Sequence, residues 1–346
     1  MLQVKFTRGI AGMEDAIDFV IAWVDGQDDR WRKQRAAFQP EISNGDDSEE
    51  RYRDWGLLRY WFRGAERFAP WVRKIHFVTW GHIPLWLNVN HPKLHIVKHE
   101  DYIPKEFLPT FNSHVIEMYL HRIKGLSERF VYFNDDMFMI RPLCQTDFFK
   151  GGKPCDMLAF QPVVANPLNP TMSCILLNNI LMLSKYFNKR KNVWEHPDNY
   201  FCLKYPPLYF IYNFLELFFP LYSGLYTVHG PSPFIKQTFY DVWEKEETVL
   251  LQMSKDRFRS KNGINQYLFR EWQKLSGNFY PRNILKFFCY MNVQDENARL
   301  IRIIESQKRK IICINDAPIT GNQEAVCREL QTAFQRVLPE ASEFER

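Results

Sequence analysis

An apolar strand that ends in two adjacent acids most constrains this chain. Residues 130–134 read Phe-Val-Tyr-Phe-Asn, and Asp135, Asp136, Met137 and Phe138 follow them. Aromatic and β-branched residues favour a buried strand. Two carboxylates at its end are costly to bury unless a cation or several donors compensate them. Taken alone, the pair fits a solvated strand exit as well as it fits a cation site.

Length and composition bound the classes of protein that this chain can belong to. With 346 residues the chain can form one large α/β domain or two small ones. Its aromatic share of 16% predicts thick cores or surfaces that meet sugars, lipid or a partner. The net charge of +5 is modest and does not argue for a nucleic-acid partner, which usually requires a dense basic stripe, so we expect none. Weak attraction to an anionic membrane or a phosphorylated substrate remains compatible with it.

Cysteine usage and hydropathy indicate the compartment. The seven cysteines are scattered and form no CxxC pair, which favours a reducing environment over a disulfide framework. Residues 1–12 lack the apolar core and cleavage site of a secretory signal. A run of about eighteen apolar residues, as a membrane span needs, does not occur. We expect a cytoplasmic protein, peripheral to the inner face of the membrane if it contacts lipid.

Two more apolar segments end in acids. Residues 17–24 lead into Asp25 and Gly26, and residues 310–315 lead into Asp316. Apolar strands alternate with helical patterns, which predicts an α/β fold with a mainly parallel sheet. Ligands bind at the carboxyl ends of strands in such sheets, and clustered carboxylates suit Mg²⁺ or Mn²⁺. Neither G-x-G-x-x-G nor a P-loop motif occurs, so a dinucleotide fold is not supported.

A helix over residues 112–123 leads into the strand that carries the paired acids. Asn112 or Ser113 is expected to cap it. Glu117 and His121 are four residues apart, so on one helix they share a face. They form either a weak surface pair or two contacts to one ligand.

Three other residues stand out as candidates for contacts to a phosphorylated substrate. Arg59 lies on a helical pattern, where it either faces solvent or binds phosphate. His229 is followed by Gly230, Pro231 and, after one serine, a second proline, so its backbone is stiff; this stiffness either positions the histidine or only prepares the helix expected after Pro233. Arg259 precedes a helix expected from about residue 263, where a cation is unfavourable unless an anion lies between it and the helix.

The middle of the chain reads as an insertion between two parts of a core. We assign residues 1–150 and 229–346 to the core and 151–228 to an irregular, aromatic-rich helical region. Residues 205–220 are densely aromatic and follow the basic run 189–191. They are too short to span a bilayer. They fit an in-plane membrane contact or an ordinary core helix equally well.

The chain resembles the Stealth family of sugar phosphotransferases over most of its length and in the family's order. The segments that carry the resemblance are 17–26 for the first block; 51–143, with 69–72, 111–117, 121–123 and 133–136, for the second; 229–234 through 265–266 for the third; and 312–316 for the fourth.

The resemblance implies a function and a fold. It implies a Rossmann-like (GT-A-like) α/β core with an added helical region. It implies transfer of a sugar-1-phosphate from a UDP-sugar to a hydroxyl of a glycan or lipid-linked glycan, with release of UMP. The cofactor would be Mg²⁺ or Mn²⁺. The chain is short and without inserted domains, as in the bacterial capsule and exopolysaccharide hexose-1-phosphate transferases of the family.

The resemblance and the residue chemistry together assign roles. The expected metal ligands are Asp135, Asp136, Asn315 and Asp316. The expected catalytic residues are His229 as the base, Arg259, Asp136 and Glu117. The expected substrate-binding residues are Asp25, Gly26, Arg59, Asn112, Ser113, His121 and Arg122.

Two departures from the family pattern and two rival functions accompany this assignment. Ala317 stands where a second acid often occurs, and residues 260–263 lack the acid that often precedes the following isoleucine. A metal-dependent glycosyltransferase would use the same paired acids and release UDP instead of UMP. A carbohydrate- or membrane-binding module without catalysis would bind the donor and not turn it over.

Overall fold

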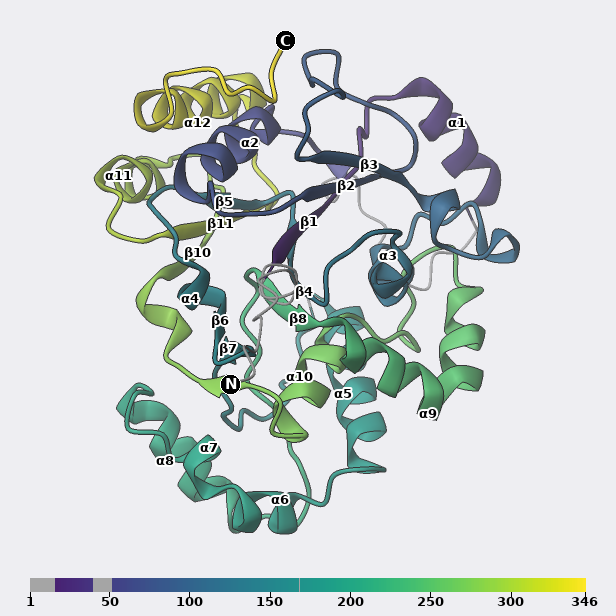
Figure 1. Cartoon of the computed structure of the whole chain (residues 1–346), viewed down its shortest axis with the longest axis vertical. Coiled ribbons are helices and arrows are strands. Elements are labelled where there is room, and N and C mark those ends of the chain that lie inside the picture. Colours follow the sequence, from purple (N-terminus) through teal and green to yellow (C-terminus); the bar gives the residue numbers. More distant parts are fainter. Residues whose placement is uncertain (1–15, 40–51, 168) are drawn as a thin grey trace, which may run out of the picture.

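A five-stranded sheet forms the centre of the molecule (Figure 1). The computed structural model describes residues 16–39, 52–167 and 169–346, so the expectation for residues 1–12 lies outside the described residues. The strand order is β3-β2-β1-β4-β8, with all pairs parallel except β4 and β8. The five strands are β1 (Ile17–Trp23), β2 (Ile75–Thr79), β3 (Leu94–Lys98), β4 (Arg129–Asn134) and β8 (Ser232–Ile235).

Two smaller sheets lie beside the central one. In the second sheet β11 is parallel to β10 and antiparallel to β5. The third sheet pairs β7 with β6 and β9. Their strands are β5 (Met137–Met139), β10 (Phe288–Asn292), β11 (Ile311–Asn315), β6 (Phe149–Lys150), β7 (Lys153–Asp156) and β9 (Tyr280–Pro281).

Helices cover both faces of the central sheet, which is why its strands are apolar on both faces. On β4, Val131 and Phe133 face one core, while Phe130 and Tyr132 face the other. The first core includes residues of α2 (Leu58–Phe68), α11 (Ala298–Ser306) and α12 (Gln323–Val337). The second includes residues of α3 (Ser113–Met118), α5 (Pro170–Ser184), α9 (Lys236–Ser254) and α10 (Tyr267–Leu275).

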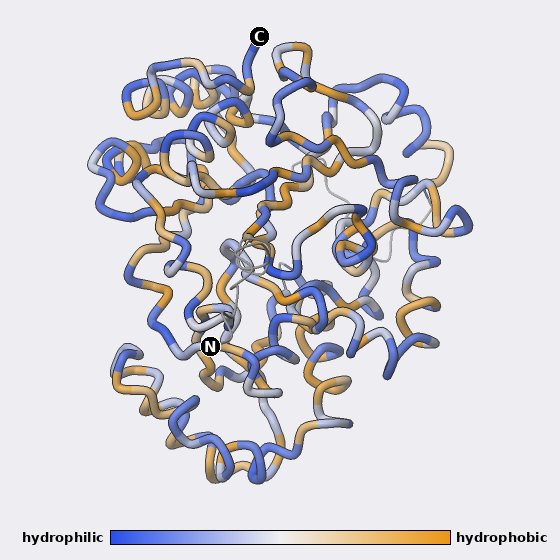
Figure 2. Tube along the Cα trace, in the orientation of Figure 1, coloured by the Kyte–Doolittle hydropathy of each residue, from blue (hydrophilic) through white to orange (hydrophobic). Residues whose placement is uncertain are grey.

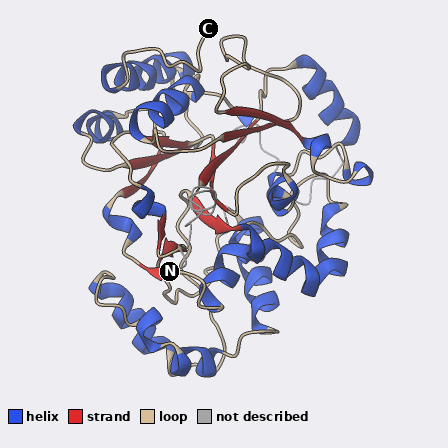
Figure 3. Cartoon of the chain, in the orientation of Figure 1, coloured by secondary structure: helices blue, strands red, loops and turns tan. Residues whose placement is uncertain are grey.

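The remaining helices lie outside the central sheet, as Figure 3 shows, and α4 contributes Phe148 to the first core. Helices α6 to α8 form the lower end of the molecule in Figure 1. Among the described residues, the helices lack the length and apolar character needed to cross a bilayer. These helices are α1 (Asp29–Phe38), α4 (Gln145–Phe148), α6 (Lys189–Glu195), α7 (Pro197–Tyr200) and α8 (Pro207–Glu216).

The expected Rossmann-like α/β class is confirmed by this mainly parallel, helix-covered sheet. One expectation is wrong: the three acid-ended strands do not share a sheet, because β11 belongs to the second one. Strand β8 is not predicted from the sequence, because Pro231 and Pro233 favour a loop. The strand forms because it lies antiparallel at the edge of the sheet, where proline is tolerated. The division at residues 150 and 228 stays a prediction.

A second correction concerns the helix after Asn112. Asn112 caps α3 as expected, its side chain accepting a hydrogen bond from the His114 amide. The helix ends at Met118, however, and His121 lies in a separate 3-10 turn over residues 120–122. Glu117 and His121 therefore do not share a helix face.

Candidate functional site

Asp135 and Asp136 lie at the junction of two sheets. They are the two residues between β4, in the central sheet, and β5, in the second sheet. The chain of β11 runs antiparallel to β5, and the Ile314 amide donates to the Asp136 carbonyl over 2.8 Å. The carboxyl end of β11 therefore reaches the paired acids from the second sheet.

A cleft of about 660 Å³ opens at this junction. Its acidic side chains are Asp54, Glu117, Asp135, Asp136 and Asp316. Two guanidinium groups, those of Arg53 and Arg259, also line it. The carboxylates outnumber the arginines, so an anionic substrate needs additional positive charge to enter.

His229 connects Asp136 to Tyr267. Its Nε2 atom lies 3.0 Å from Oδ2 of Asp136, and its Nδ1 atom lies 3.0 Å from the hydroxyl of Tyr267. Both ring nitrogens thus have partners, so the ring orientation is fixed. Burial lowers the pKa of His229, but the adjacent Asp136 carboxylate outweighs it and raises that pKa above its usual 6.5.

The two oxygens of Asp136 have different surroundings. Oδ2 contacts His229 and also accepts a hydrogen bond from the Cys313 thiol over 3.2 Å. Burial raises the pKa of Cys313 well above its usual value, so the sulfur remains a neutral donor. Oδ1 is buried and has no hydrogen-bond partner among the described residues. A buried carboxylate oxygen without a donor is suited to a cation.

Asp135 lies in an electrostatically unfavourable position. Its side chain is exposed to the solvent of the cleft. Desolvation by the surrounding cleft walls and repulsion by the carboxylates of Asp136 and Asp54 nevertheless raise its pKa to about 8. Burial and the neighbouring Asp25 carboxylate likewise raise the pKa of Asp54. Repulsion among these acids is relieved by a divalent cation, for which oxygen donors are the preferred ligands of Mg²⁺ and Mn²⁺.

The thiol and imidazole beside Asp136 raise the alternative of a softer metal. Asp136, His229 and Cys313 offer ligand atoms within 4.8 Å of one another. A thiol ligates zinc as the thiolate, and Cys313 is held neutral. The oxygens of Asp135 and Asp136 therefore fit a hard cation better than the three-residue group fits zinc.

Asn315 and Asp316 enter the cleft at the end of β11. The Asn315 side chain donates to Oδ1 of Asn292, which orients its amide. Oδ1 of Asp316 lies 3.5 Å from a guanidinium nitrogen of Arg53. The structure thus brings all four predicted metal ligands to one cleft, and it places an arginine beside Asp316.

Glu117 lies in the wall of the cleft and is buried. It accepts hydrogen bonds from the Tyr132 hydroxyl over 3.3 Å and from the Gln266 amide over 3.2 Å. Burial raises its pKa to about 7, although Arg259 opposes the shift. Near neutral pH this side chain can therefore accept or donate a proton or a hydrogen bond.

Arg259 reaches the cleft on a loop that Asn112 holds. A guanidinium nitrogen of Arg259 donates to the Ser113 hydroxyl over 2.7 Å. The Asn112 amide donates to the carbonyls of Asp256 and Phe258, so it supports this loop. Ser113 lines the cleft, whereas Asn112 is buried beneath it.

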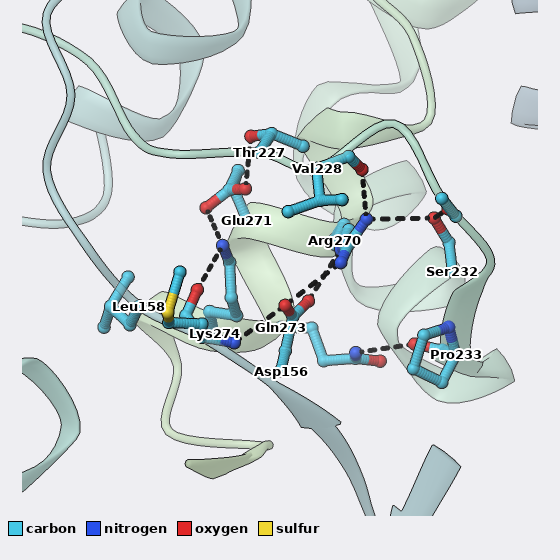
Figure 4. Close-up of polar contacts among 12 residues, drawn as sticks. Asp156, Leu158, Thr227, Val228, Ser232, Pro233, Arg270, Glu271, Gln273 and Lys274 are labelled. Atoms are coloured by element: carbon cyan, nitrogen blue, oxygen red, sulfur yellow. Dashed lines mark hydrogen bonds and ion pairs between the residues drawn. The ribbon is translucent and has the colours of Figure 1, made fainter. Parts of the chain in front are cut away.

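Helix α10 holds the loop that carries His229, as Figure 4 shows. Arg270 is buried, pairs with both oxygens of Asp156, and donates to the carbonyl of Val228 over 2.9 Å. Glu271 accepts from the Thr227 hydroxyl over 2.7 Å. The segments on both sides of His229 are fixed in this way, because Gln273 in turn donates to the Pro233 carbonyl.

Some predicted substrate-binding residues lie outside the cleft. Asp25 and Arg59 line a neighbouring hollow that shares Asp54 with the cleft, and Gly26 lines a third. The guanidinium of Arg59 lies 5.4 Å from the centre of the Trp86 ring. Their binding roles stay predictions.

The contacts of His121 and Arg122 do not include the paired acids. His121 is buried against the rings of Phe239, Tyr240 and Trp243, and burial lowers its pKa to about 3. Arg122 is exposed and stacks on Tyr119. Neither lines the cleft.

The sequence did not single out four cleft or near-cleft residues. Tyr267 fixes the His229 ring, Cys313 donates to Asp136, and Arg53 and Asp54 add charge to the cleft. An available signal was the charged pair Arg53-Asp54 directly before the apolar pattern of α2. Tyr267 and Cys313 sit in core-type patterns and carry no local signal.

Comparisons with known proteins identify relatives over the whole chain. Stealth protein CR2, conserved region 2, matches residues 51–156, which confirms the second block. The chain is 43% identical to a capsular polysaccharide phosphotransferase WcwK of Streptococcus pneumoniae, covering 96% of this chain and 98% of that one. It is 36% identical to the receptor polysaccharide phosphotransferase WefC of Streptococcus gordonii, covering 96% and 100%.

A third relative and one solved structure also match the chain. The exopolysaccharide phosphotransferase cps2G of Lactiplantibacillus plantarum is 34% identical, covering 95% of this chain and 96% of that one. An active-site mutant of LgtC matches with a TM-score of 0.36 and 10% identity, covering 91% of this chain and 95% of that one. On its full-length relatives, the chain belongs to the Stealth family of sugar phosphotransferases.

Proposed function

We propose that the protein transfers a sugar-1-phosphate from a UDP-sugar to a hydroxyl of a glycan acceptor and releases UMP, in capsule or exopolysaccharide synthesis. The observation that carries the proposal is the Asp136–His229–Tyr267 chain of contacts in a cleft with Glu117 and Arg259. The names of the full-length relatives, which are polysaccharide phosphotransferases, support the reaction class.

In this reaction the acceptor oxygen attacks the phosphorus that bears the sugar. The bond between the two phosphates breaks, and UMP leaves with the electron pair. The acceptor hydroxyl loses its proton to the neutral form of His229, and the nearby Asp136 carboxylate, which raises the pKa of His229, stabilises the imidazolium that results. Because Nε2 contacts Asp136, the hydroxyl must take the place of Oδ2 beside that nitrogen.

Tyr267 sets the protonation of the base. For Nε2 to accept a proton it must be unprotonated, so the ring proton has to reside on Nδ1. The Tyr267 oxygen, 3.0 Å away, can accept that Nδ1–H. Tyr267 is a positioning residue, because it acts on the reaction through His229.

The charged residues of the cleft divide the remaining work. Asp135 and Asp136, with Asn315 and Asp316, would hold Mg²⁺ or Mn²⁺, which supplies positive charge to the diphosphate when bound. Arg259 stabilises negative charge on the transferred phosphate. Glu117 accepts a hydrogen bond from a hydroxyl of the sugar or the ribose. The acceptor is a glycan, either free or lipid-linked.

The nucleotide product tests the proposal. The purified protein is incubated with a panel of UDP-sugars, Mg²⁺ and a polysaccharide acceptor, and the nucleotides are separated by chromatography. We expect UMP and a new phosphodiester in the acceptor, with both lost in Asp136→Asn. Release of UDP would instead establish glycosyl transfer. Donor binding without turnover at any Mg²⁺ concentration would establish a binding module.

A further inference from the structure

The end of the molecule formed by α6 to α8 exposes many large apolar side chains. We call it the α8 surface and define it by the exposed apolar side chains of residues 194–221, chiefly Trp194, Leu203, Phe214, Phe218, Phe219 and Leu221. Leu203 is 93% exposed, Trp194 87% and Leu221 75%, so these side chains project from the surface. Hydrophobic segments recur along this end of the chain in Figure 2. An apolar patch of this kind marks an interaction site.

The outward face of α8 carries no charge. Glu216 is the only charged residue between positions 205 and 222, and it is buried. Its carboxylate lies 2.7 Å from Nζ of Lys189, which also donates to the carbonyls of Glu216 and Leu221. The inner face is thus fixed by a buried ion pair, and the outer face is left fully apolar.

Positive charge borders the α8 surface. Lys204 adjoins Leu203 in the chain and donates to the Tyr280 hydroxyl over 2.9 Å, and Nζ of Lys150 lies 4.8 Å from the centre of the same ring. These two ammonium groups lie beside the same ring and lower the pKa of Tyr280. Arg190 and Lys191, on α6 beside Trp194, are also exposed, and the exposed acids Glu195 and Asp198 lie next to them in the chain.

We propose that the α8 surface inserts into the boundary between the headgroups and the acyl chains of an anionic lipid bilayer. An uncharged apolar face with tryptophan at its edge and cations around it is typical of helices that lie in the membrane interface. Side chains that project singly fit among mobile lipid chains, whereas a folded partner would need pockets to receive them. The lysine and arginine side chains attract anionic headgroups over about a Debye length.

Helix α5 relates this surface to the cleft. Asn169 and Met172, at its start, line the cleft, and its last residue precedes α6 by a short connection. Its fifteen residues span about 22 Å. Leu177 and Leu181 are exposed along it. The bilayer would therefore lie about one helix length from the cleft.

Vesicle binding tests the proposal independently of any enzyme activity. The full chain is sedimented with vesicles of phosphatidylcholine alone and with vesicles of equal parts phosphatidylcholine and phosphatidylglycerol. We expect binding to the anionic vesicles that weakens with added salt. Brominated lipid should quench the fluorescence of the wild type more than that of Trp194→Phe, because Trp194 would contact the acyl chains.

Two sets of variants separate the apolar from the electrostatic contribution. Phe218→Ala/Phe219→Ala/Leu221→Ala should weaken binding to anionic vesicles at least about tenfold, because three inserted side chains are shortened. Lys150→Gln/Lys204→Gln should remove most of the preference for phosphatidylglycerol. Leu85→Ala is the matched control, since Leu85 is 95% exposed and lies outside the α8 surface. Circular dichroism verifies that each variant is folded.

Three results would overturn the proposal. The first is that the wild type binds neither kind of vesicle. The second is that the triple alanine variant binds anionic vesicles as tightly as Leu85→Ala does. The third is a dimer, detected by sedimentation equilibrium and abolished by the triple alanine variant, without vesicle binding; the occupant of the α8 surface would then be a second copy of the chain.

Discussion

The Nε2 atom of His229 lies 3.0 Å from Oδ2 of Asp136, although 93 residues separate the two in the chain. Asp136 follows the central strand β4, whereas His229 precedes the edge strand β8, which pairs with β4. The contact therefore depends on the antiparallel pairing at this edge of the sheet. It places an imidazole with a raised pKa beside the carboxylate of the expected cation site.

Replacing the base tests the role of His229. His229→Ala should lower kcat by about a hundredfold to ten-thousandfold, the usual contribution of a general base. UMP release under saturating donor measures it. His196→Ala is the matched control, because His196 is exposed and lies outside the cleft. Turnover by His229→Ala close to that of the control would show that the base is another group.

Tyr267→Phe should separate kcat from KM. It removes the hydroxyl that holds Nδ1 of His229 and leaves the ring in place. We expect kcat to fall about tenfold with KM for the donor unchanged, because the base loses its preferred tautomer. Steady-state kinetics measure both, and imidazole ¹⁵N shifts report the tautomer directly. A change in KM alone would mean that the hydroxyl contacts substrate instead.

Glu117 should make stability fall with rising pH. Its pKa is about 7 in the folded protein against the usual 4.5, so the folded state binds the extra proton in between. The stabilisation is present below about pH 4.5 and is lost as the pH rises through about 7, by on the order of 3 kcal/mol. Urea unfolding at several pH values measures it. Glu117→Gln should flatten this slope, and an equal slope in both proteins would contradict the assignment.

Metal binding should strengthen with pH. Because its pKa is raised to about 8, Asp135 must release a proton when a cation binds. Calorimetric affinity for Mn²⁺ should rise up to about pH 8, and Asp135→Asn should weaken binding and reduce this dependence. Glu343→Gln is the control, since Glu343 belongs to a separate group with Glu66 and His91. A pH dependence retained in Asp135→Asn would assign the released proton to another residue.

Arg270→Met should destabilise the fold. Both Arg270 and Asp156 are buried, so the variant leaves the Asp156 carboxylate buried without its ion-pair partner, at a cost of about 3–5 kcal/mol of unfolding free energy. Urea denaturation measures the loss. Arg336→Met removes an exposed pair with Glu305 and should change stability by less than about 1 kcal/mol. Equal stability of the two variants would show that the buried pair is dispensable.

Local pattern was enough for part of the site. Apolar strands followed by Asp25, by Asp135 with Asp136, and by Asp316 predicted the class of fold and an acidic site, because burial and period are local properties of a strand. The cap at Asn112 was likewise local and is confirmed. The aromatic segment 205–220 was ambiguous, since hydropathy does not report whether a face is covered.

The sequence by itself determined the strand ends, the paired acids and the helical caps, because these depend on neighbouring residues. Only the tertiary structure decided that Asp316 reaches the cleft from a second sheet and that Tyr267 contacts His229. It also decided that His121 packs against aromatic rings and does not line the cleft. These contacts join residues far apart in the chain. They form through strand pairing and helix packing, and no local pattern in this sequence encodes them.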